Sequence, residues 1–143
     1  MTAYIDTSAL AKCYIREQRS LEVLDWVEDR GEVATSTLVL VEFRCLLARR
    51  RRDGTIDAAM ERRVLSEFDN HVRTGAWRVV HGRLGDFASA RDMIDSLPAV
   101  PLRALDAIHL AAARSLDSMD FATSDRKQAD AARALGFNVH DFS

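Results

Sequence analysis

The sequence AYIDTSAL, residues 3–10, places a single acid directly after a short apolar run. Residues 3–5 are typical of a short buried strand, and Thr7 or Ser8 is a favourable N-cap for a helix that follows. Asp6 lies at the junction between these two elements. Its carboxylate has two interpretations: it caps the helix itself, or it is the first part of an active site.

The rest of the chain repeats this alternation of strand and helix. We expect further strands at 32–36, 77–80, 119–123 and 138–142, and helices at 7–17, 20–30, 38–52, 57–72, 86–96, 103–115 and 127–135. Strands separated by helices predict an α/β fold, with a central, mainly parallel sheet between two helical layers. We expect residues 1–143 to form a single domain of this kind.

Composition limits the class of protein. Hydrophobic residues make up 48% and charged residues 29% of the 143 residues, which is typical of a globular protein. No apolar run approaches the roughly 20 residues that span a bilayer, and no signal peptide is evident, so we expect a cytoplasmic protein with no membrane contact. The net charge of −2 argues against non-specific coating of nucleic acid, so any nucleic acid must be bound by a local patch.

Two acids follow predicted strands. Asp6 comes directly after residues 3–5, and Asp125 comes after the FATS segment at residues 121–124. In parallel α/β sheets, functional residues gather beyond the carboxyl ends of the strands. Asp6 and Asp125 therefore both fall where an active site is expected.

Two further acids lie among apolar residues in predicted helices. Glu42, in TLVLVEFRCLL, shares a helix face with Leu38 and Leu46. Asp106, in LRALDAIHLAAA, is surrounded by Ala, Leu and Ile, although Asp is unfavourable in the middle of a helix. A buried lone carboxylate is costly unless it is paired or binds a metal.

Each acid also has a local explanation. Asp6 can be an N-cap, Glu42 can pair with a buried arginine, Asp106 can be a first-turn acid, and Asp125 can start the turn before the last helix. Taken together, the four would repel one another unless a cation lay between them. A ligand set made only of oxygens suits Mg²⁺ or Mn²⁺. The hydroxyls of Thr7, Ser8 and Ser124 either cap helices or orient these carboxylates.

Four segments in order, YIDTSAL, VEFRCLL, LRALDAIHLAAA and DFATSDRKQADAARALGF, resemble the PIN-domain family, and within it the VapC toxins of bacterial toxin–antitoxin pairs. The resemblance covers essentially the whole chain. It implies a Mg²⁺- or Mn²⁺-dependent endoribonuclease that forms a homodimer and is bound by a cognate antitoxin. The acids Asp6, Glu42, Asp106 and Asp125 match the family's acidic positions, and the fourth position varies most in the family.

Other polar residues lie close to these acids in sequence. His109 shares a helix face with Asp106, and we interpret it as a supporting residue rather than as a metal ligand or general base. Arg44 and Arg103 either hold substrate phosphate or balance the acids. The run Arg49–Arg52 is either a solvated helix end or an edge that contacts RNA.

Alternatives to a nuclease remain open from the sequence. One is a phosphohydrolase that uses Asp6 as a covalent nucleophile, as haloacid dehalogenase-like enzymes do, but Ser8 stands where those enzymes usually have a second Asp. Another is a non-catalytic interaction module of the same fold. The apolar helix at 38–47 is either buried or partly exposed at a subunit or antitoxin interface. The sequence does not identify the RNA that is cleaved.

Overall fold

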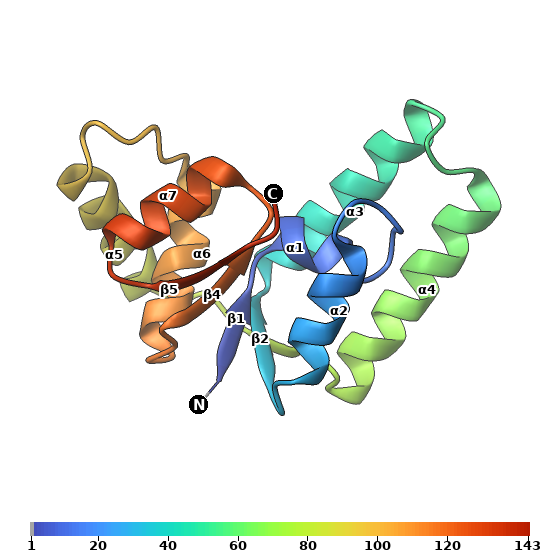
Figure 1. Cartoon of the computed structure of the whole chain (residues 1–143), viewed down its shortest axis with the longest axis horizontal. Helices are drawn as coiled ribbons and strands as arrows, with labels where there is room; N and C mark the ends of the chain where they lie inside the picture. The colour runs from blue at the N-terminus through green and yellow to red at the C-terminus, as the bar shows by residue number, and fades with distance from the viewer. Residues whose placement is uncertain (1) are drawn as a thin grey trace.

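The computed structural model describes residues 2–143, in which five strands and seven helices alternate along the chain (Figure 1). The elements in order are β1 (Ala3–Ile5), α1 (Thr7–Ala11), α2 (Ser20–Glu28), β2 (Val33–Ser36), α3 (Leu38–Arg52), α4 (Ala58–Thr74), β3 (Arg78–Val80), α5 (Leu84–Ser96), α6 (Ala104–Ser115), β4 (Asp120–Thr123), α7 (Arg126–Ala134) and β5 (Asn138–Asp141). All strand pairs are parallel, in the order β3-β2-β1-β4-β5. The α/β prediction is confirmed.

The central strand β1 separates two helical layers because its side chains alternate between the two faces of the sheet. Ala3 and Ile5 pack into a core with Phe43, Phe68 and other apolar residues of α1 to α4. Tyr4 packs into a second core with residues of α5 to α7. Figure 1 shows α2, α3 and α4 on one side of the sheet and α5, α6 and α7 on the other. The three-layer arrangement predicted from the sequence is therefore confirmed.

The strand order positions the functional site. The chain builds the sheet outward from β1 through β2 to β3, then returns to the other side of β1 to form β4 and β5. The winding direction therefore reverses between β1 and β4. Such a reversal leaves a crevice beyond the carboxyl ends of the two strands, where α/β proteins commonly bind ligands. Asp6 follows β1 and Asp125 follows β4.

Helix α1 differs from its prediction in both length and cap. It ends at Ala11 rather than near residue 17, and its N-cap is Asp6 rather than Thr7 or Ser8. Asp6 has the extended backbone of a strand end, and its Oδ1 accepts a hydrogen bond from the backbone N–H of Ala9 at 3.0 Å. The Ser8 hydroxyl donates to the same oxygen at 2.7 Å. The prediction that a hydroxyl residue caps α1 was wrong, because the acid directly after the strand takes that position.

Helices α3 and α4, of 15 and 17 residues, are the longest in the described chain, and they form an antiparallel pair that extends away from the sheet (Figure 1). Val64 and Phe68 of α4 pack under α3, whereas most other α4 side chains are at least partly exposed. Among residues 2–143, no helix combines the length and the apolar character needed to cross a membrane.

Candidate active site

The four acids singled out in the sequence line one cavity, which has a volume of about 400 Å³. Asp6 lies after β1 and Asp125 after β4, while Glu42 and Asp106 lie in the first halves of α3 and α6. Further lining residues include Thr7, Ser8, Val41, Cys45, Leu46, Arg49, Arg103, Leu105, His109 and Gln128. The structure thus brings together acids that are separated by up to 119 residues in the sequence, since 125 − 6 = 119.

Asp6 is the most buried of these acids, with 2% of its surface exposed. Its Oδ1 accepts hydrogen bonds from Ser8 and Ala9, and its Oδ2 accepts one from the Thr123 hydroxyl at 2.6 Å. Burial raises the pKa of Asp6, although these hydrogen bonds, and the positive charge that His109 carries when it is protonated, oppose the increase. The carboxylate is therefore held in a fixed orientation by three donors, at a site where its charge is poorly solvated.

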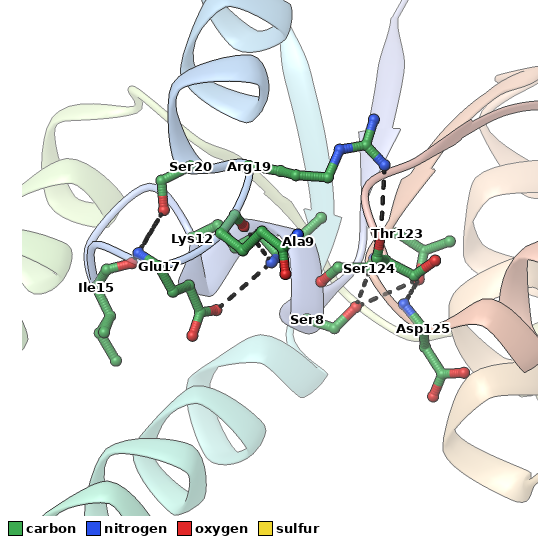
Figure 2. Close-up of polar contacts among 12 residues, drawn as sticks. Ser8, Ala9, Lys12, Ile15, Glu17, Arg19, Ser20, Thr123, Ser124 and Asp125 are labelled. Atoms are coloured by element: carbon green, nitrogen blue, oxygen red, sulfur yellow. Dashed lines mark hydrogen bonds and ion pairs between the residues drawn. The ribbon is translucent and has the colours of Figure 1, made fainter. Parts of the chain in front are cut away.

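The hydroxyls of Ser8 in α1 and Thr123 in β4 join the start of α1 to the segment that follows β4 (Figure 2). The Ser8 hydroxyl donates to Asp6 and accepts from the backbone N–H of Ser124 at 3.0 Å. The Thr123 hydroxyl also donates to Asp6, and it accepts from the backbone N–H of Asp125 at 3.0 Å. Each hydroxyl therefore connects the Asp6 carboxylate to the backbone that carries Asp125. Ser8 thus orients a carboxylate, whereas Ser124 contributes its backbone rather than its side chain.

Asp125 and Asp106 share one arginine. Asp125 caps α7, because its Oδ1 accepts from the backbone N–H groups of Lys127 at 2.9 Å and Gln128 at 3.2 Å. Its Oδ2 lies 3.3 Å from Nη2 of Arg103. The Nε of Arg103 lies 3.4 Å from Oδ2 of Asp106. Burial raises the pKa of Asp106 against the charge of Arg103, and the neighbouring Asp125 carboxylate adds to the increase.

Glu42 is held by a histidine. Its Oε1 lies 2.6 Å from Nε2 of His109 and accepts a hydrogen bond from the Thr7 hydroxyl at 2.9 Å. Burial alone would raise the pKa of Glu42, but the hydrogen bonds from His109 and Thr7, with the positive charge that His109 carries when it is protonated, outweigh burial and lower the pKa. The interpretation that Glu42 pairs with a buried arginine was wrong: the partner is His109, which is 1% exposed.

The arginines predicted near the acids divide between two locations. Arg49 and Arg103 line the cavity. Arg44 points elsewhere, since its Nη1 lies 3.5 Å from Oε2 of Glu61 in α4, and it is not among the residues that line the cavity. The structure therefore gives Arg44 a role in pairing α3 with α4. Arg103 is the cavity cation that contacts the acids directly.

Sequence reasoning missed Thr123 and Tyr4. Thr123 is fully buried and donates to Asp6. Tyr4 is fully buried in β1, and its hydroxyl lies 2.7 Å from Nδ1 of His109. Burial and the charge of Asp6 raise the pKa of Tyr4 well above its ordinary value, so the phenol is neutral. The hydroxyls of Tyr4 and Thr123, each in a short and mostly apolar strand, could have indicated a role, because a buried hydroxyl normally has a hydrogen-bond partner.

The donor chemistry of the cavity fits a hard divalent cation. Asp6, Glu42, Asp106 and Asp125 offer carboxylate oxygens, which Mg²⁺ and Mn²⁺ prefer. As the side chains of residues 2–143 stand, no three acidic, histidine or cysteine groups converge closely enough to hold a metal ion. Arg103 lies against two of the carboxylates and His109 against a third. A cation held by Asp106 and Asp125 would have to replace the Arg103 side chain there, and Arg103 is 74% exposed.

Residues 3–134 match the family model described as PIN domain. The chain is 34% identical over 140 residues to Ribonuclease VapC47 of Mycobacterium tuberculosis, covering 94% of this chain and 92% of that protein. It is 30% identical over 144 residues to Ribonuclease VapC35 of the same species, covering 95% and 93%. The chain therefore belongs to the PIN-domain family and, within it, to the VapC ribonucleases.

Solved structures share the fold. VapC20 of Mycobacterium tuberculosis, a toxin that cleaves the sarcin–ricin loop, superposes with a TM-score of 0.66 at 21% identity, covering 96% of each chain. VapBC2 of Rickettsia felis, solved with a DNA fragment of its promoter, gives a TM-score of 0.71 at 11% identity over 100% of each chain. FitAcB of Neisseria gonorrhoeae gives 0.68 at 15% identity, over 99% of this chain and 97% of that one.

The buried charge of Asp6 leads to a prediction about stability and pH. Because burial raises its pKa above 3.8, the folded protein binds this proton more tightly than the unfolded chain does. Ionised Asp6 therefore costs folding free energy at neutral pH, and this cost is lost as the pH falls through the raised pKa and below 3.8. We expect the free energy of unfolding of the wild type to rise relative to that of Asp6→Asn between neutral pH and about pH 4. Urea unfolding of both proteins measures this difference; a difference that is independent of pH would contradict the prediction.

Proposed function

We propose that this protein is a metal-dependent endoribonuclease and the toxin component of a toxin–antitoxin pair. The observation that carries the proposal is the set of four acids, from four separate segments, that line one cavity at the carboxyl ends of β1 and β4. Membership in a family whose characterised relatives are named ribonucleases supports the RNA substrate. We propose Mg²⁺ or Mn²⁺ as the cofactor, because every candidate ligand is a carboxylate oxygen.

The residues of the chain have distinct roles in this proposal. Asp6, Glu42, Asp106 and Asp125 hold the divalent cation, which supplies an activated water and stabilises the charge that develops on the phosphodiester. The hydroxyls of Ser8 and Thr123 fix the orientation of Asp6. Arg103 balances Asp106 and Asp125 in this structure; with a cation at these acids, its guanidinium would be available to contact a substrate phosphate. The chain needs no covalent nucleophile in this scheme.

The arginines at the end of α3 provide a local patch for RNA. Arg49 lines the cavity, and Arg51 and Arg52 are exposed beyond it. We propose that these three side chains contact the RNA backbone on either side of the scissile phosphate, because phosphate contacts position a nucleic acid without reading its sequence. A patch of this kind reconciles RNA binding with the net charge of −2.

Exposed apolar side chains next to the cavity support an antitoxin partner. Val41, one residue before Glu42, is 67% exposed, and Leu105, one residue before Asp106, is 45% exposed. Leu40 is also exposed on the same helix as Val41. We propose that a cognate antitoxin segment covers these residues along the groove. The homodimer and the cytoplasmic location stay predictions. Three exposed apolar side chains make α5 a candidate surface for the homodimer: Leu84, Phe87 and Ile94.

The covalent alternative has no support in the geometry of Asp6. Both of its oxygens accept hydrogen bonds, and the side chain is almost fully buried. Oδ1 accepts two hydrogen bonds and Oδ2 accepts one, so only Oδ2 keeps an unoccupied lone pair, and the proposal assigns that lone pair to the cation. The non-catalytic alternative is disfavoured because the acids that line the cavity are all present.

Removal of metal tests the proposed function. We expect purified protein to cleave RNA in the presence of Mg²⁺ or Mn²⁺, to lose that activity fully in excess EDTA, and to regain it when the cation is restored. Gel analysis of end-labelled RNA measures the cleavage, and Asp6→Asn purified in parallel controls for contaminating nuclease. Cleavage that continues undiminished in EDTA would overturn the proposal.

Arg103 leads to a separate prediction about metal affinity. An exposed ion pair is worth about 0–1 kcal/mol, so removal of the guanidinium should strengthen Mn²⁺ binding by up to about fivefold while it weakens RNA cleavage. Calorimetric titration of Arg103→Gln with MnCl₂ measures the first effect. The matched control is Arg133→Gln, because Arg133 bridges Asp130 and Asp141, at 3.1 Å each, away from the cavity. Weaker Mn²⁺ binding by Arg103→Gln than by the control would contradict this role.

A further inference from the structure

A buried chain of hydrogen bonds runs from the central strand to the cavity. The Tyr4 hydroxyl of β1 lies 2.7 Å from Nδ1 of His109 in α6. Nε2 of the same ring lies 2.6 Å from Oε1 of Glu42 in α3. Tyr4 and His109 are 0% and 1% exposed, so bulk water does not compete for these contacts. Three elements, one from each layer of the fold, thus meet through a single imidazole.

The chemistry of the three groups fixes the direction of both hydrogen bonds for the neutral form of the His109 imidazole. An ionised carboxylate only accepts, so Nε2 of His109 carries the proton that is shared with Glu42. A neutral imidazole has one N–H group, and Nδ1 is then an acceptor. Tyr4 is the donor to Nδ1, because a phenol keeps its proton in a buried site. The hydroxyl of Tyr4 therefore selects the Nε2–H tautomer.

The position of this hydroxyl is set by the sheet. Tyr4 pairs with Ala34 of β2 and with Phe121 of β4, so its backbone is held on both sides. Its ring stacks on the Phe121 ring, with centroids 5.5 Å apart and planes 9° apart. The His109 ring meets the Tyr4 ring edge-on, at 5.9 Å and 70°. These contacts leave the donor little freedom to move relative to the imidazole.

The contacts from His109 and Thr7 give the two carboxylate oxygens of Glu42 different roles. The contacts from His109 and Thr7 both fall on Oε1. Oε2 has no hydrogen-bond partner within residues 2–143, and Glu42 lines the cavity. Oε2 is therefore the oxygen that remains available to a ligand in the cavity.

We infer that Tyr4 and His109 are positioning residues, which hold Glu42 by Oε1 so that Oε2 is presented to a divalent cation. The inference rests on the proposed metal-dependent function. It assigns a role to the buried phenol two residues before Asp6, and it makes His109 a support rather than a ligand. Partners of this kind orient metal ligands in many sites, and their loss weakens metal binding.

The first test measures the tautomer in the metal-free protein and does not depend on activity. Histidine ¹⁵N shifts distinguish the Nε2–H ring, the Nδ1–H ring and the doubly protonated ring, and His109→Gln identifies the signal. We expect the Nε2–H form in the wild type, and a mixture of forms in Tyr4→Phe. The control is Tyr14→Phe, because the Tyr14 hydroxyl lies 2.6 Å from Nδ1 of His71 and neither residue lines the cavity. A doubly protonated or Nδ1–H ring in the wild type would overturn the inference.

The second test measures binding of Mn²⁺ by calorimetry. We expect Tyr4→Phe to bind Mn²⁺ about three- to tenfold more weakly than Tyr14→Phe does. We expect His109→Leu to bind Mn²⁺ up to about a hundredfold more weakly than the wild type does. His109→Gln, whose amide can still donate to Glu42, should recover part of that loss. If the wild type binds Mn²⁺ and the two Tyr variants bind it with equal affinity, the inference is overturned and the proposed function stands. A wild type that binds no Mn²⁺ would instead overturn the proposed function.

Discussion

Asp6→Asn is expected to lower the rate of RNA cleavage by at least about a hundredfold, because loss of a direct ligand should exceed the 10- to 100-fold effect of losing a supporting residue. The same change should alter the free energy of unfolding little, because removal of a buried charge offsets the loss of the hydrogen bond from Thr123 to Oδ2. Asn is as good an N-cap as Asp, so the bond from the Ala9 N–H to the side-chain oxygen is retained. The substitution also removes a charge that is almost fully buried. Single-turnover cleavage assays and urea unfolding measure the two effects.

The chain contains a matched control for this substitution. Asp57 caps α4 as Asp6 caps α1: it has the same extended backbone, and its Oδ1 accepts from the Met60 N–H at 2.8 Å. Asp57 is exposed and lies away from the cavity. We expect Asp57→Asn to keep full activity. A similar loss in both variants would mean that the activity responds to an Asp-to-Asn exchange away from the cavity as well, and the specific metal role of Asp6 would be rejected.

Phe43→Ala is expected to lower the free energy of unfolding by about 3–5 kcal/mol, a large share of the 5–15 kcal/mol that is typical of a domain. Phe43 is fully buried next to Glu42 in α3. Its ring centroid lies 4.8 Å from that of Phe68 and 5.4 Å from that of Tyr14, so the truncation leaves a cavity between α3, α4 and the turn after α1. Urea unfolding followed by tryptophan fluorescence measures the loss.

Val41→Ala is the control for this prediction, since it lies on the same helix but is 67% exposed. Its free energy of unfolding should change by no more than about 0.5 kcal/mol. If Phe43→Ala lowered the free energy of unfolding by less than about 1 kcal/mol, the prediction would be contradicted. The packing of α3 on α4 would then contribute far less to stability than large-to-small core substitutions usually indicate.

The architecture could be predicted from the sequence because strand and helix patterns alternate without ambiguity from Ala3 onward. The clustering of the acids could also be predicted, since Asp6 and Asp125 both follow strands. The hydrogen-bond and ion-pair partners of the acids could not be predicted. The sequence contains many arginines near Glu42, and nothing in its local pattern indicates that His109, 67 residues away, occupies that place.

The sequence left the N-cap of α1 open for a related reason. Preferences for capping rank Asp, Ser and Thr as near equals, so the sequence alone cannot choose among Asp6, Thr7 and Ser8. The choice is made by β1: its hydrogen bonds keep Asp6 in an extended conformation, and the backbone N–H of Asp6 itself donates to the Ala122 carbonyl at 3.0 Å. Long-range strand pairing, which no local pattern encodes, therefore decides where the helix begins.

Asp6 caps α1 and, on the proposed function, also holds the cation. This combination has a consequence for cells that carry two copies of this gene. The carboxylate that caps α1 can be exchanged for an amide without loss of the cap, so an inert copy one substitution away would still fold. Such a copy would keep Val41 and Leu105 exposed. On the proposed function, it would compete for the antitoxin as a decoy and release active toxin. A single change at position 6 would thus convert the protein from a nuclease into an antagonist of its own inhibitor.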